Sequence, residues 1–121
     1  MARDRILNFT VVTPEKQVVA ETADSVVIPA HDGELGIGQM RYRTGGQTRR
    51  LFIDGGFAQV YADNVTVLTE HAAAASDISD EMIATAQRAV SEAGGKTLEA
   101  VEARGLAARR LSVLRKLRGG Q

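Results

Sequence analysis

Three side chains with catalytic or metal-binding chemistry, His31, Asp32 and Glu34, lie in one short stretch of the sequence. An imidazole beside carboxylates can form an acid–base pair or supply ligands to a metal ion. Such sites normally draw their groups from separate elements of the fold, and only His71, far along the chain, could complete this one. The sequence therefore favours a solvated polar turn, and it predicts no catalytic residue, no metal and no cofactor.

Two other kinds of site are considered. Residues 33–38, GELGIG, are rich in glycine but lack the strand–loop–helix pattern with a following Lys-Ser or Lys-Thr that cradles phosphate. Basic residues near Tyr42 and Phe52 could contact nucleic acid, but residues 1–72 are net acidic and have no repeated stacking aromatics. Cysteine is absent, which excludes disulfides and thiolate chemistry. We therefore expect no nucleic acid partner.

Charge is spread unevenly along the 121 residues, although the formal net charge is zero. Residues 1–72 carry seven basic and nine acidic side chains, residues 73–95 one and four, and residues 96–121 seven and two. The last segment therefore has a net charge of +5, which suits either an acidic partner surface or a solvated helix face. No apolar run of 18 residues occurs, so direct membrane insertion is not predicted.

Alternating apolar residues predict strands in the first part of the chain. The expected strands are residues 6–13, 17–20, 24–29, 39–44 and 47–53. Residues 51–68, LFIDGGFAQVYADNVTVL, are predicted to form core strands that are separated by Gly55 and Gly56 and by an Asp-Asn turn. Residues 1–72 are therefore expected to form an antiparallel β-sandwich.

Helical patterns follow an alanine-rich segment at residues 70–75, which is interpreted as a linker. Residues 76–79 offer capping side chains before a first helix that ends at Gly94 and Gly95. A second helix is expected from Thr97 to Arg118, with basic residues around its apolar stripe. This stripe consists of Leu98, Val101, Leu106, Ala107, Leu111, Leu114 and Leu117. Residues 73–121 are thus predicted to form a linker and an antiparallel αα-hairpin, which makes the fold class α+β.

Three motifs, in order, resemble the epsilon subunit of the F-type ATP synthase. They are FTVVTPEK at residues 9–16, VVIPAHDGELGI at residues 26–37 and FIDGGFAQVYADNVTVLTEHA at residues 52–72. The resemblance implies a non-catalytic subunit of the central rotor, peripheral on the cytoplasmic face of the bacterial cell membrane. It further implies that the sandwich binds the gamma subunit and the ring of c subunits, and that the hairpin can swing up and inhibit ATP hydrolysis.

The resemblance also assigns site residues. In the family, the Glu of the GELG motif faces the polar loops of the c subunits, which implies a c-ring contact at Glu34 together with Asp32 and His31. The extended C-terminal helix of the family reaches the catalytic alpha/beta head, where basic side chains lie near an acidic segment of the beta subunit. The residues expected to carry any such inhibition here are Arg109, Arg110, Arg115 and Lys116.

Two departures from the family pattern limit what it implies. The family usually continues after GELGI with a Pro-Gly-His-Ala-Pro segment and another strand, whereas Ile37 here runs directly into Gly38 and Gln39. The Asp and Arg of a motif associated with ATP binding are missing from residues 78–83, ISDEMI, so no nucleotide binding is predicted. The alternative function is a free-standing sandwich enzyme or ligand-binding module that uses His31, Asp32 and Glu34.

Overall fold

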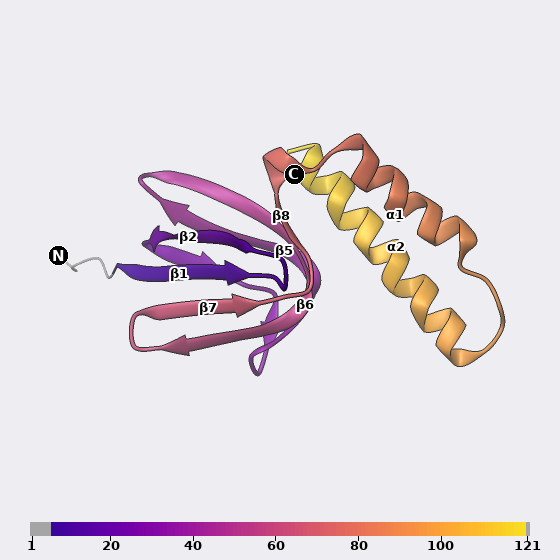
Figure 1. Cartoon of the computed structure of the whole chain (residues 1–121), viewed down its shortest axis with the longest axis horizontal. Helices are drawn as coiled ribbons and strands as arrows, with labels where there is room; N and C mark the ends of the chain where they lie inside the picture. The colour runs from indigo at the N-terminus through magenta and orange to yellow at the C-terminus, as the bar shows by residue number, and fades with distance from the viewer. Residues whose placement is uncertain (1–5, 121) are drawn as a thin grey trace.

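The computed structural model describes residues 6–120 and shows a β-rich N-terminal part beside two helices (Figure 1). The strands are β1 (Leu7–Val12), β2 (Gln17–Ala23), β3 (Ser25–Val27), β4 (Ala30–His31), β5 (Glu34–Thr44), β6 (Gln47–Tyr61), β7 (Asn64–Leu68) and β8 (Ala72–Ala74). A short 3-10 helix, η1 (Ala75–Asp77), precedes α1 (Asp80–Glu92) and α2 (Leu98–Arg118). The predicted α+β class, a β-sandwich followed by a helical hairpin, is confirmed.

The strands form one strongly bent sheet with the order β2-β1-β7-β6-β5-β3, in which β4 pairs with β5 and β8 pairs with β6. All pairs are antiparallel except β1 with β7, which is parallel. The long strand β6 belongs to both halves of the sheet. Its first half pairs with β5 and β8, and its second half pairs with β7. This bend brings the inner faces of the two halves together as a sandwich.

The glycine pair at the bend differs from the sequence prediction. Gly55 and Gly56 do not connect two strands but lie inside β6, with φ values of 76° and 116°. A Cβ atom on Gly56 would lie 1.9 Å from the carbonyl oxygen of Leu68 on β7. The positive φ values allow the bend, and the missing side chain allows β7 to approach. The prediction of separate strands was wrong because a local pattern cannot distinguish a bent strand from a turn.

The core between the two halves is built mainly from aliphatic side chains, as the low aromatic content predicts. Its fully buried members are Phe9, Val11, Met40, Leu51, Ile53 and Val67. Phe9 also packs against Tyr42, with ring centroids 4.8 Å apart. Burying several such side chains supplies about 1.5–3 kcal/mol each, so this core makes the sandwich the stable platform of the molecule.

Local sequence signals place both helices correctly. The Ser79 hydroxyl accepts a hydrogen bond from the Met82 amide, and the Thr97 hydroxyl accepts one from the Ala100 amide. These side chains satisfy amide groups that the first helical turn leaves without a partner. The predicted apolar stripe of α2 is only half correct, because Leu111, Leu114 and Leu117 are buried whereas Leu98, Val101 and Leu106 are exposed.

The alanine-rich segment is not an irregular linker. Residues 72–74 form β8, which pairs with residues 51–53 of β6, and the Asp54 amide donates to the His71 carbonyl at 3.0 Å. Alanine side chains give no period-of-two signal, so this strand is determined by pairing with a distant part of the chain. Within residues 6–120, no helix has the length and apolar character needed to cross a bilayer.

Candidate functional site

The predicted polar turn is a β-hairpin between β4 and β5. Ala30 pairs with Leu35 and His31 with Glu34, so Asp32 and Gly33 form a two-residue loop. Their φ values of 53° and 83° are those of a type I′ turn, which Asp tolerates and Gly favours. The local sequence therefore determines this turn and the position of its side chains.

The turn is held against β6, but its side chains point into solvent. The Ala58 amide donates to the Gly33 carbonyl at 2.8 Å. The side chains of His31 and Asp32 are 96% and 93% exposed, and their Nε2 and Oδ2 atoms lie 3.6 Å apart. Glu34 is also exposed and is paired with Phe57, whose side chain is 62% exposed. The turn is therefore a rigid, polar protrusion beside an apolar residue.

The side chains of this turn are open to solvent. The side chains of His31 and Asp32 are almost fully exposed, whereas small-molecule sites bury most of their ligand in a cleft. In the described part of the chain, no three His, Asp or Glu side chains lie close enough to hold a metal ion together. The structure brings His31, Asp32 and Glu34 together on one hairpin, as the sequence predicts.

The hairpin of α1 and α2 packs on the outer face of β5 and β6. Ile37 and Phe52 from the sheet meet Leu114 and Leu117 from α2, and Ile78 before α1 joins them. Phe52 reaches this face because its neighbours in β6, Leu51 and Ile53, point into the sandwich core. This second apolar cluster is small, so polar contacts also contribute to the docking of the hairpin.

Two of the predicted inhibitory arginines make these polar contacts. Arg110 donates through Nε to Oδ2 of Asp54 at 2.8 Å, and Arg109 donates through Nε to the Ile37 carbonyl at 3.0 Å. Arg115 and Lys116 lie exposed on α2. The four basic residues therefore divide into two that hold the hairpin on the sandwich and two that face solvent.

Sequence reasoning missed Asp54, which is the acidic partner in this interface. Its side chain is 10% exposed and that of Arg110 is 38% exposed. The two residues are 56 positions apart. No local pattern connects them, and only the period of two in β6, which turns residue 54 to the same face as Phe52, gives a signal that could have found Asp54.

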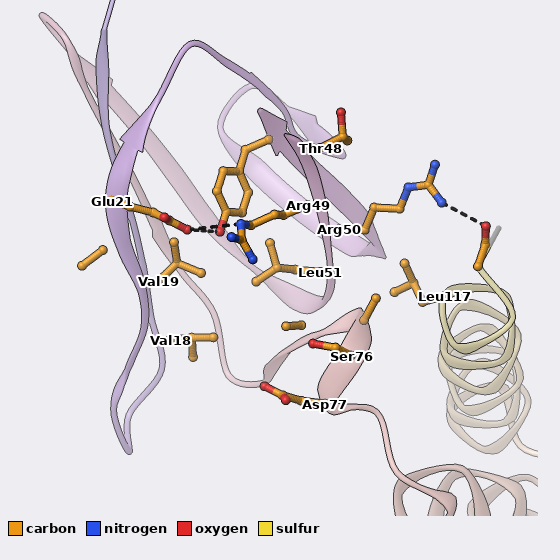
Figure 2. A pocket seen from close by; sticks show the side chains of 15 residues that line it. Val18, Val19, Glu21, Thr48, Arg49, Arg50, Leu51, Ser76, Asp77 and Leu117 are labelled. Atoms are coloured by element: carbon orange, nitrogen blue, oxygen red, sulfur yellow. Dashed lines mark hydrogen bonds and ion pairs between the residues drawn. The ribbon is translucent and has the colours of Figure 1, made fainter. Parts of the chain in front are cut away.

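A groove of about 670 Å³ opens between β2 and the C-terminal end of α2 (Figure 2). At its rim, the Tyr42 hydroxyl donates to Oε2 of Glu21, and Nε of Arg49 lies 3.9 Å from the same oxygen. Burial and this hydrogen bond raise the pKa of Tyr42 to about 12. Tyr42 therefore stays neutral at physiological pH and fixes one side of the groove.

Comparison with known proteins defines the class to which this fold and these surfaces belong. A family model described as the ATP synthase, Delta/Epsilon chain, beta-sandwich domain matches residues 6–38 and 35–75. These pieces cover more than half of the chain. The chain belongs to this family of ATP synthase delta and epsilon chains.

Relatives in the family are named ATP synthase epsilon chain. The Desulforapulum autotrophicum protein is 39% identical over 124 residues, which cover 86% of this chain and 92% of that protein. The Nitratidesulfovibrio vulgaris (strain Miyazaki F) protein is 37% identical over 91 residues, which cover 64% of this chain and 68% of that protein. Several of these alignments thus span about two thirds of the relative's length.

Solved structures share the fold. A chain of the Tetrahymena thermophila mitochondrial ATP synthase central stalk and c-ring aligns with a TM-score of 0.63 at 12% identity, covering 95% of this chain and 98% of that chain. A chain of the Euglena gracilis mitochondrial ATP synthase aligns with a TM-score of 0.50 at 19% identity, covering 95% of this chain and 69% of that chain. At these identities the likeness concerns the architecture alone.

The comparisons also show that a relative has residues with no counterpart in this chain. The 91-residue alignment with the N. vulgaris protein includes 64% of the 121 residues of this chain, which is about 77 residues. About 14 aligned positions of that protein therefore have no counterpart in this chain. The two pieces matched by the family model overlap at residues 35–38, which lie in β5. Here β5 runs through this point as one strand paired with β6.

Proposed function

We propose that this chain is a non-catalytic central-stalk subunit of an ATP synthase that couples proton transport to ATP synthesis. The observation that carries the proposal is the whole-length arrangement, a sandwich followed by a docked helical hairpin, in a chain whose relatives are named ATP synthase epsilon chain. In this proposal residues 1–72 are the domain that binds the gamma subunit and the c-ring. In residues 73–121, the first two residues complete β8 of the sheet, and the helical hairpin that follows acts as a movable unit.

The proposed location is peripheral, on the cytoplasmic face of a bacterial cell membrane, as part of the ATP synthase complex. A rotor subunit that lies between gamma and the c-ring needs a rigid surface that polar loops of the ring can contact. The β4–β5 turn that carries His31, Asp32 and Glu34 offers such a surface. Its backbone is hydrogen-bonded to β6, while its side chains are exposed. We therefore assign the c-ring contact to these three residues.

Purification under native conditions tests membership of the complex. The chain should co-purify with gamma and the catalytic head, and recovery only as an unattached monomer would refute the proposal.

The substitution Glu34→Lys tests the c-ring contact. It should weaken the coupling of ATP hydrolysis to proton pumping in inverted vesicles, because it reverses the charge on the turn. Glu15→Lys, on the exposed turn between β1 and β2, is the matched control and should leave coupling intact. Equal coupling in the two variants would remove the c-ring assignment.

We further propose that the hairpin, when it leaves the sandwich, inhibits ATP hydrolysis through Arg109, Arg110, Arg115 and Lys116. Undocking must first break the contacts of Arg109 and Arg110 with β5 and β6. These two residues would therefore serve both states, whereas Arg115 and Lys116 are exposed while the hairpin is docked. Exposed ion pairs contribute about 0–1 kcal/mol each, so inhibition needs several acting together.

The division of the basic residues gives a sharp test of inhibition. The double variant Arg115→Ala/Lys116→Ala should raise the ATPase rate of the assembled head without changing hairpin docking. Deletion of residues 96–121 should raise the rate at least as much while leaving gamma binding intact. Equal ATPase rates for both variants and the unaltered chain, at the same occupancy of the head, would refute the inhibitory role.

A further inference from the structure

Arginine side chains gather on both strands of the β5–β6 hairpin, and those of β6 already have partners. Nε of Arg49 lies 3.9 Å from Oε2 of Glu21, and Arg50 donates to the Gly120 carbonyl at 3.2 Å. Figure 2 shows the two side chains directed apart, Arg49 toward β2 and Arg50 toward the end of α2. The arginines of β5 are therefore the cations of this hairpin that remain available to a ligand.

Arg41 and Arg43 lie on the outer face of β5. Tyr42 between them is buried in the core, so the alternation of a strand turns both arginines outward, and both are exposed. Within residues 6–120, neither side chain takes part in an ion pair or a hydrogen bond. Arg41 also pairs directly with Arg50 across the hairpin, and like charges in such a pair destabilise a sheet. The fold thus keeps uncompensated positive charge on this face.

Two hydroxyl groups flank Arg43 on the same face. Ser25 of β3 pairs with Arg43 from one side, and Thr48 of β6 pairs with it from the other. In the next row across the sheet, Val27 of β3 pairs with Arg41. Directly opposite residues of an antiparallel pair point to the same face, so all these side chains project outward together.

The same side chains line a hollow of about 230 Å³, whose lining also includes Tyr42 and contains no Asp or Glu. Gly45 and Gly46 form the tight turn beside it, with φ values of 57° and 81°, and so hold β5 and β6 in register. The hollow is smaller than the roughly 300–1,000 Å³ of pockets for drug-sized ligands. Its size and positive charge suit a compact anion.

We propose that this hollow binds the phosphate group of a small molecule through its two guanidinium groups and its two hydroxyl groups. A guanidinium donates two parallel N–H bonds to phosphate oxygens, and each hydroxyl adds an O–H donor. Together these donors can meet several oxygens of one tetrahedral group, more than a planar carboxylate presents. The bound negative charge also offsets the repulsion between Arg41 and Arg50.

Larger anionic partners suit this face less well. Single-stranded nucleic acid stacks its bases on exposed aromatic side chains, but Tyr42 and Phe52 are each only 4% exposed. A long acidic polypeptide gains affinity from a row of free cations, whereas Arg49 and Arg50 are already engaged. The hollow is also at the opposite end of β5 from the polar turn that we assign to the c-ring, away from lipid headgroups on that assignment.

The inference goes beyond the proposed rotor role and is tested on the isolated full chain. The probe is inorganic pyrophosphate, titrated at constant ionic strength against chloride while backbone amide shifts are followed by NMR. Shifts at residues 41–43 and 48 should saturate. Arg41→Ala/Arg43→Ala should weaken binding at least about tenfold, because it removes both guanidinium groups. The matched control Arg88→Ala/Arg115→Ala removes two exposed guanidinium groups from the helices and should bind as the unaltered chain does.

The hydroxyl groups give a second test. Thr48→Val keeps the branched shape of the side chain and should weaken binding about two- to fivefold, whereas Thr22→Val, on the exposed part of β2, should not. Equal pyrophosphate affinity of the two double arginine variants, or shifts that do not saturate in the unaltered chain, would overturn the site. Tighter binding of a poly-Asp peptide than of pyrophosphate at the same amides would overturn the assignment to phosphate.

Discussion

The contact between Arg110 and Asp54 should control the docking of the hairpin. Oδ2 of Asp54 lies 2.8 Å from Nε of Arg110, and the carboxylate is only 10% exposed. Hydrogen bonds to charged groups contribute about 1.5–3 kcal/mol. Because the Arg110 side chain is 38% exposed, water screens part of its attraction to Asp54. We expect Arg110→Ala to weaken docking by about 1–2 kcal/mol, which multiplies the undocked fraction about 5- to 30-fold.

The chain has no cysteine, so a pair of introduced thiols reports this equilibrium directly. Gln47→Cys on the sandwich and Ser91→Cys on α1, both exposed, carry a donor and an acceptor dye for single-molecule energy transfer. Arg110→Ala and Asp54→Asn should each increase the population with low transfer. Arg115→Ala is the matched control on the same helix and should not. If Arg110→Ala changes the distribution no more than Arg115→Ala does, the apolar cluster and Arg109 hold the hairpin and the reasoning is refuted.

Three further predictions concern stability. Gly56→Ala should cost at least about 3 kcal/mol in urea unfolding, because its Cβ would meet the Leu68 carbonyl, whereas Gly36→Ala, with open space around it, should cost about 1 kcal/mol or less. The pKa of Tyr42 is raised to about 12, so the folded state holds its proton above the usual value of 10. The contribution of this proton to the free energy of unfolding is complete below pH 10 and is lost as the pH rises toward 12, at up to about 1.4 kcal/mol per pH unit. The variant Tyr42→Phe should not show this fall in the free energy of unfolding with pH. Leu114→Ala should lower the free energy of unfolding of the hairpin by about 2–4 kcal/mol, measured by amide exchange in α2 while exchange in β1 stays unchanged.

Part of the candidate site could be predicted because its signals are local. Asp32 and Gly33 adopt the positive φ values that their residue types allow, and the alternation on either side directs His31 and Glu34 to a hairpin. The exposure of these side chains follows from their polarity. The groove beside β2 could not be predicted, because it depends on which strand lies at the edge of the folded sheet.

The sequence by itself determined the two helices, their caps at Ser79 and Thr97 and the alternation of the strands, since each depends on residues within a turn or two of the chain. Only the tertiary structure decided that Gly56 bends a continuous strand and that Asp54 meets Arg110. Both depend on contacts between segments far apart in the sequence, and the free energy of such contacts exists only once the sheet has closed. For the same reason residues 72–74, which lack any strand pattern of their own, became β8.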